Sequence, residues 1–132
     1  MKNLLFFCLM AISIFTASCK KEEVQQNDIV GKWTAKEILA NGTNQLGSGT
    51  FTIDFKKDKT YEVYYNFSGQ SATEQGTWSV PSESKLFMKA NSSSSTGQTF
   101  EILKLEYPLF AKAILQFQYT SGSNTYRYNF EK

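Results

Sequence analysis

Histidine is absent from this chain of 132 residues, and cysteine and proline occur only twice each. Without histidine, the chain lacks the side chain that most often serves as general base and metal ligand near neutral pH. No glycine-rich loop opens a helix that would hold a phosphate. A formal net charge of +2 is too small an excess of positive charge to indicate binding to nucleic acid. These shortages argue against an enzyme, a metal site and a nucleic-acid-binding protein.

Long apolar runs are missing as well, except at the start of the chain. After Lys2, residues 4–15 are mostly apolar, and small residues at 16–18 precede Cys19. A basic start, about a dozen apolar residues and a small-residue cleavage site are typical of a secretory signal, which is too short to span a bilayer. We therefore expect residues 1–18 to be removed. Cys19 would then be the one cysteine of an exported chain, without a disulfide partner.

The residues around this cysteine resemble a known export signal. Thr16-Ala17-Ser18-Cys19 is similar to the lipobox of bacterial lipoproteins, with threonine where leucine is usual. The following Lys20-Lys21-Glu22-Glu23 resembles the signal that sends Bacteroidota lipoproteins to the cell surface. The resemblance implies that Cys19 carries acyl chains such as palmitate in the outer membrane, with residues 19–28 as a flexible tether. The alternative is ordinary cleavage after Ser18, which leaves an unmodified thiol.

Residues 29–132 read as one domain of short strands. Apolar side chains alternate with polar ones, and polar turns separate the alternating segments. Leu103 and Leu105 fall out of phase with Phe100 and Ile102, so we expect a bulge there. The expected strands span about 30–39, 51–56, 61–67, 73–80, 85–90, 100–105, 109–120 and 126–130.

Short connections join these eight strands throughout, and no segment has a convincing helical period. Antiparallel strands joined in sequence remove both exposed sheet edges only by closing. The sequence therefore predicts an all-β, antiparallel, up-and-down, eight-stranded barrel in which the tyrosine-rich last strand pairs with the first. A two-sheet sandwich is the alternative.

Two short motifs extend this prediction to a family. Gly31-Lys32-Trp33 resembles the Gly-x-Trp signature of lipocalins and the wider calycin group, and Gly76-Thr77-Trp78-Ser79 resembles the short lipocalin-like domains of Bacteroidota lipoproteins. The resemblance implies that Trp33 lies across a closed end of the barrel. A basic side chain of the last strand would then pack over it. Arg127, the only arginine, is the candidate for this cation–π contact.

Carboxylates are the remaining candidates for chemistry. Asp54, Glu62 and Glu74 are expected on the polar faces of their strands, where a carboxylate is usually solvated. The serines at 92–95 have no base near them in sequence and read as a linker. We therefore expect no catalytic residues and no cofactor.

Two functions stay open. In the first, an eight-stranded barrel holds a small hydrophobic ligand. In the second, a solidly packed barrel binds a protein or glycan through loops 41–49, 68–72 and 91–98. Many large rings fall on the inner face and leave little room, whereas small residues such as Ala35, Gly76, Ala90 and Ala113 would open a pocket if they gather. We expect a monomer, and the candidate ligand-binding residues are Glu37, Tyr61, Tyr65, Trp78 and Tyr128.

Overall fold

The computed structural model describes residues 26–82, 84–92 and 94–132. The expected signal peptide, Cys19 and the first part of the tether lie outside these residues. In the described part, no helix is both long enough and apolar enough to cross a membrane. The elements are α1 (Gln26–Ile29), β1 (Gly31–Ala40), β2 (Thr43–Asn44), β3 (Thr50–Phe55), β4 (Thr60–Phe67), β5 (Gln70–Ser82), β6 (Lys85–Ala90), β7 (Gln98–Glu106), β8 (Ile114–Ser121) and β9 (Asn124–Glu131).

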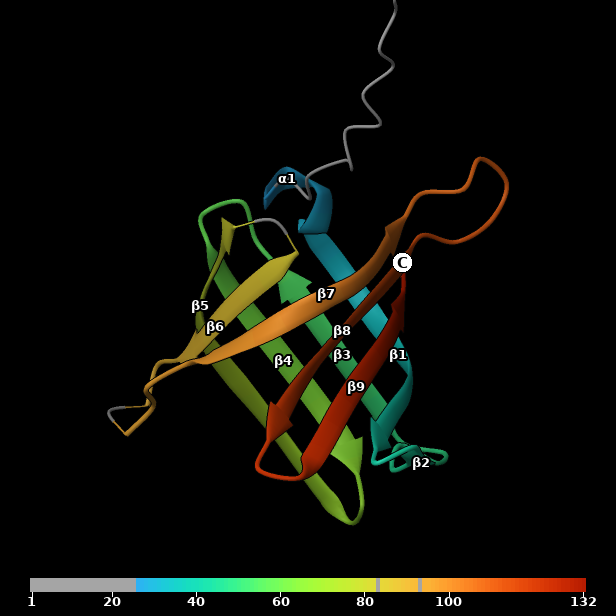
Figure 1. Cartoon of the computed structure of the whole chain (residues 1–132), viewed down its shortest axis with the longest axis vertical. Coiled ribbons are helices and arrows are strands. Elements are labelled where there is room, and N and C mark those ends of the chain that lie inside the picture. Colours follow the sequence, from blue (N-terminus) through green and yellow to red (C-terminus); the bar gives the residue numbers. More distant parts are fainter. Residues whose placement is uncertain (1–25, 83, 93) are drawn as a thin grey trace, which may run out of the picture.

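The strands form a barrel because the last strand closes the sheet onto the first (Figure 1). Strand β9 pairs antiparallel with β8 on one side and with β1 on the other, from Thr34 opposite Glu131 to Ala40 opposite Tyr126. The strands from β3 to β9 each pair with their sequence neighbours, and β2 adds only two residues beside β1. The predicted eight-stranded up-and-down barrel is confirmed, and the sandwich alternative is wrong.

Two irregular positions decide which side chains face inward. In β7 the register shifts between Ile102 and Lys104, as the apolar pattern predicted. In β1 it shifts between Ala35 and Glu37, which the sequence did not reveal. An extra residue at a bulge reverses the alternation beyond it. Ile38 is therefore buried at 6% exposure, in the place that the sequence pattern assigned to Leu39.

Two predicted boundaries are wrong. The seventh strand begins at Ile114 rather than at Leu109, because residues 107–113 form a loop between β7 and β8. Pro108 cannot donate a hydrogen bond to a sheet ladder, which explains the break. Helix α1 occupies residues 26–29, so the last residues of the expected tether are folded.

Antiparallel strands place successive connections at opposite ends of the barrel. One end carries α1, the β3–β4 turn, the β7–β8 loop and the C-terminus; we call it the closed end (Figure 1). The other end carries the β1–β3, β4–β5, β6–β7 and β8–β9 connections; we call it the open end.

Trp33 seals the closed end. Its side chain is fully buried, and its Nε1 donates a hydrogen bond to the carbonyl oxygen of Ile29 in α1 at 2.7 Å. The ammonium of Lys132 lies 4.6 Å from the centre of the Trp33 ring and donates to the carbonyl oxygen of Val30 at 2.9 Å. A Cβ on Gly31 would lie 3.1 Å from that ammonium, and Gly31 has a φ of +127°. In the Gly-x-Trp motif, Gly31 therefore leaves space for the Lys132 side chain, and Trp33 supplies the ring over which the Lys132 ammonium lies.

The prediction that Arg127 packs over Trp33 is therefore wrong. Arg127 pairs with Leu39, toward the open end of β1, and its guanidinium donates to Oε1 of Gln118 at 3.3 Å. Lys132 takes the expected place because it follows the end of β9 at the closed end. Alternation along β9 gave no reason to consider a residue beyond the strand.

Replacing Lys132 with methionine should lower the free energy of unfolding by about 0.5–2 kcal/mol, since the cation–π contact with Trp33 is lost. Burial lowers the pKa of Lys132, so desolvation of the ammonium offsets part of that contact. Arg127→Met is the matched control and should leave stability unchanged. Urea unfolding followed by circular dichroism measures both, and an equal loss in the two variants would contradict this assignment.

Candidate functional site

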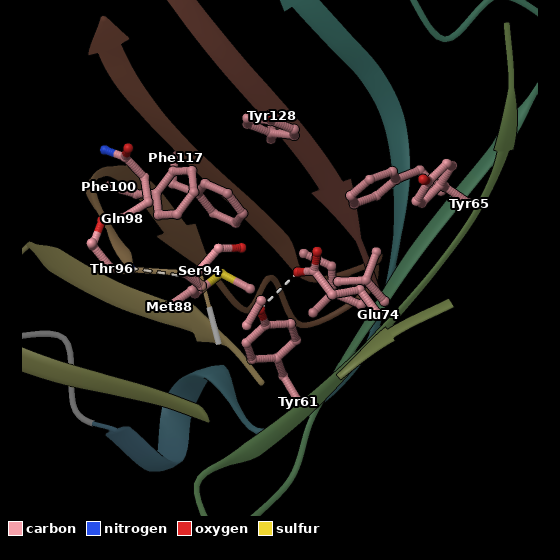
Figure 2. Close-up of a pocket in the computed structure, with 16 residues that line it drawn as sticks. Tyr61, Tyr65, Glu74, Met88, Ser94, Thr96, Gln98, Phe100, Phe117 and Tyr128 are labelled. Carbon is pink, nitrogen blue, oxygen red and sulfur yellow. Dashed lines mark hydrogen bonds between the residues drawn. The ribbon is translucent and has the colours of Figure 1, made fainter. Parts of the chain in front are cut away.

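A cavity of about 480 Å³ lies inside the barrel, toward the open end (Figure 2). Binding pockets for small organic ligands typically have volumes of about 300–1,000 Å³. Strands β3 to β9 and the β6–β7 loop supply its walls. The lining residues are Phe51, Ile53, Tyr61, Val63, Tyr65, Glu74, Met88, Ala90, Ser94, Ser95, Thr96, Gly97, Gln98, Phe100, Phe117 and Tyr128.

Aromatic rings form part of this wall. On one side, Phe51 and Tyr65 stack with their ring centres 6.4 Å apart. On the other, Phe117 stacks on Tyr128 at 5.4 Å and meets the edge of Phe100 at 5.0 Å. The Phe51 and Tyr128 rings also meet, with their centres 6.1 Å apart, so the rings form one connected part of the cavity wall.

Two small residues, Gly76 of β5 and Ala90 of β6, have different effects on the cavity. Ala90 lines the cavity and pairs with Gly76 across the two strands. Gly76 itself does not enlarge the cavity, because the Tyr61 ring lies on it: a Cβ there would be 2.6 Å from that ring and 2.1 Å from the carbonyl oxygen of Lys89. The Tyr61 ring thus packs directly on Gly76, and the small side chain of Ala90 leaves space for the cavity.

Tyr61 and Glu74 form the polar pair of the cavity. The Tyr61 hydroxyl donates a hydrogen bond to Oε1 of Glu74 at 2.8 Å (Figure 2). Burial raises the pKa of Tyr61 well above its ordinary value, and the bond to Glu74 raises it further. The phenol therefore stays protonated at neutral pH and remains a donor. Among the described lining residues, Glu74 is the only carboxylate, and none is a lysine or arginine.

The prediction that Glu74 lies on the polar face of its strand is wrong, whereas its expected contact with solvent is confirmed, because its side chain lines the cavity and is exposed. Glu74 has the same parity as Gly76 and Trp78, which both lie on the inner face of β5. Asp54 and Glu62 have the parity of the polar faces of β3 and β4 and do not line the cavity. The alternation of side chains along β5 therefore already indicated that Glu74 lies on the inner face.

Three of the five candidate ligand-binding residues line the cavity. Tyr61, Tyr65 and Tyr128 come from β4 and β9 and face it together. Tyr128 is half-buried, and burial raises the pKa of its hydroxyl well above the ordinary value. The structure thus brings these tyrosines into one site, as the inner-face pattern predicted.

The other two candidates lie elsewhere. Trp78 is 3% exposed at the closed end, where its Nε1 donates to the carbonyl oxygen of Thr60 at 3.0 Å. Its ring meets the edge of Phe55 at 5.2 Å. Glu37 points outward because of the β1 bulge and accepts a hydrogen bond from Nδ2 of Asn129 at 2.8 Å. Neither residue lines the cavity.

The β6–β7 loop is a further part of the site that the sequence did not predict. Its serine-rich residues read as a linker, yet Ser94, Ser95 and Thr96 line the cavity. Gly97 has a φ of +86°, and a Cβ there would lie 2.3 Å from the ring of Phe87. Gly97 therefore lets the chain turn closely over β6 and bring the loop to the cavity. A loop without an apolar period gives no such signal in the sequence.

Comparison with known proteins gives little beyond this geometry. No protein-family model matches the sequence, and no curated protein matches it. Among solved structures, the chain is similar to an odorant-binding protein from bovine nasal mucosa, with 15% sequence identity and a TM-score of 0.45. That match covers 86% of this chain and 76% of the other. What the cavity can bind follows from its own residues.

Proposed function

We propose that this protein binds a small hydrophobic ligand in the open end of its barrel, as a monomer. The observation that carries the proposal is the cavity of about 480 Å³, walled by aromatic rings, in a barrel whose other end Trp33 seals. The competing function, a solid barrel that binds proteins or glycans through its loops, needs an interior filled by side chains. The space beside Ala90 favours the ligand-binding function.

The polar pair indicates which ligands fit. A carboxylate without a cation beside it attracts donors and cations and repels anions. A ligand with an apolar body and a hydroxyl or amine group can donate to Glu74, next to the Tyr61 hydroxyl. A fatty acid would bring a second carboxylate against Glu74. The ligand class is therefore a neutral or cationic amphiphile.

We also propose that the protein is a lipoprotein anchored through Cys19 in the outer membrane, at the cell surface. The lipobox-like residues before Cys19 and the Lys-Lys-Glu-Glu segment after it support this localisation. The domain begins with α1 at the closed end, so an anchor on that side leaves the open end toward solvent. Ligand would then enter from the side away from the membrane.

Reducing the volume of the cavity should weaken binding. Ala90→Phe places a ring in the space beside Tyr61 and should weaken binding of the fluorescent probe 1-N-phenylnaphthylamine by roughly tenfold or more, a cost above about 1.4 kcal/mol. Lys89→Phe adds the same ring on the outer face of β6 and should leave the affinity unchanged. Fluorescence titration measures both, and equal affinities would contradict binding inside the barrel.

Removing the charge of Glu74 should change ligand preference. In competition with the same probe, the wild type should bind decylamine and decanol better than decanoate. Glu74→Gln should weaken decylamine by roughly tenfold, since a hydrogen bond to a charged group contributes about 1.5 kcal/mol or more. Glu62→Gln, whose carboxylate accepts from Nε2 of Gln75 at 3.0 Å outside the cavity, is the control. An unchanged affinity of Glu74→Gln for decylamine would contradict the ligand class.

The lipid anchor predicts the mass of the mature N-terminal peptide. In protein purified from its own cells, that peptide should begin at Cys19 and carry acyl chains, because the proposed anchor requires both cleavage before Cys19 and acylation of this residue. Tandem mass spectrometry of a tryptic digest measures it. A peptide with an unmodified Cys19 thiol would overturn the anchor and leave the ligand-binding proposal untouched.

A further inference from the structure

The β7–β8 loop presents an apolar tip to solvent. Leu109 is 92% exposed and Phe110 is 100% exposed. In the part of the chain that the structure describes, three other large apolar or aromatic side chains are exposed, and none exceeds 52%. Two adjacent apolar residues at the end of a projecting loop are unfavourable in water, so contact with an apolar phase would stabilise them (Figure 1).

Several contacts fix the base of this loop. The Tyr107 hydroxyl donates a hydrogen bond to the carbonyl oxygen of Asp28 and accepts one from the ammonium of Lys132 at 3.4 Å. On the other side of the loop, Ala113 and Lys132 exchange two backbone hydrogen bonds of 3.1 Å. The tip therefore projects from a base that is held against α1 and the end of β9.

The position of the N-terminus identifies the apolar phase. Cys19 precedes Gln26, the first residue of α1, by seven residues, and α1 lies at the same end of the barrel as the loop. Seven residues span at most about 25 Å. Acyl chains on Cys19 would therefore hold the closed end, and the loop with it, close to the lipid surface.

Basic side chains near the tip fit a lipid headgroup layer. Lys112 follows Phe110 by two residues; its side chain is 70% exposed, and its Nζ lies 3.6 Å from Oε2 of Glu131. The exposed β3–β4 turn, which includes Lys57 and Lys59, lies at the same end. Long lysine side chains can stay at the level of anionic headgroups while neighbouring apolar residues enter the acyl region.

We infer that Leu109 and Phe110 insert into the membrane that carries the Cys19 acyl chains and form a second contact with it. This inference rests on the proposed lipid anchor. The second contact fixes the orientation of the barrel, with its closed end on the membrane and its cavity facing solvent. A lipid anchor alone would let the domain tumble on its tether.

Brominated-lipid quenching tests this contact on the lipidated full-length protein. Phe110→Trp places a fluorophore at the loop tip, and Ser123→Trp places one on the exposed β8–β9 turn at the opposite end. Each is purified from its own cells and reconstituted into vesicles of phosphatidylethanolamine and phosphatidylglycerol, with or without bromine on the acyl chains. Emission above that of the wild type, which contains Trp33 and Trp78, reports the added residue.

The inference predicts that bromine quenches the added emission of Phe110→Trp and spares that of Ser123→Trp. If protein that floats with the vesicles shows equal quenching in Phe110→Trp and Ser123→Trp, or no quenching in either, the loop contact is overturned and the anchor stays intact. Failure of the wild type to float overturns the anchor and this inference together. In a chain made unlipidated by Cys19→Ala, the double variant Leu109→Ser/Phe110→Ser should weaken vesicle partitioning by roughly tenfold or more, and unchanged partitioning contradicts insertion.

Discussion

The antiparallel pairing of β1 with β9 is the constraint on which the rest of the structure depends. It removes the two free edges that an open sheet of this length would expose, and it gives the alternating side chains one shared interior. It also brings Lys132, at the end of the chain, over Trp33, near the start of the domain. Without this pairing there would be neither a sealed end nor a cavity.

The two ends of the barrel differ in how their side chains pack. At the closed end, buried rings and aliphatic side chains pack without polar groups among the fully buried residues described. Toward the open end, aromatic rings line part of the wall, and the small side chain of Ala90 leaves space beside them. The same period-two pattern thus produces a solid core at one end and a hollow at the other, and the difference lies in side-chain size. The cavity follows from side-chain size, notably at Ala90, rather than from a change of fold.

Strand alternation predicted the fold and about half of the site, because it reports which side chains share a face. It placed Tyr61 and Tyr128 inside correctly. It failed at Glu37, because the bulge in β1, unlike the one in β7, was not recognised in the apolar pattern and reverses the faces beyond it. The general preference of carboxylates for solvent outweighed the inner parity of Glu74 and gave the wrong face. Lys132 was missed because it lies past the end of its strand, where alternation carries no information.

Chemical-shift mapping by methyl NMR, with 1-N-phenylnaphthylamine as ligand, tests the central claim most directly. The aromatic probe shifts the resonances of methyl groups beside it. If the ligand lies in the hollow of the barrel, the methyls of Ile53, Val63 and Met88 should shift, while those of Leu86 and Leu115 in the core should not. Shifts confined to surface methyls, or none at saturating probe, would contradict a hollow, ligand-binding barrel.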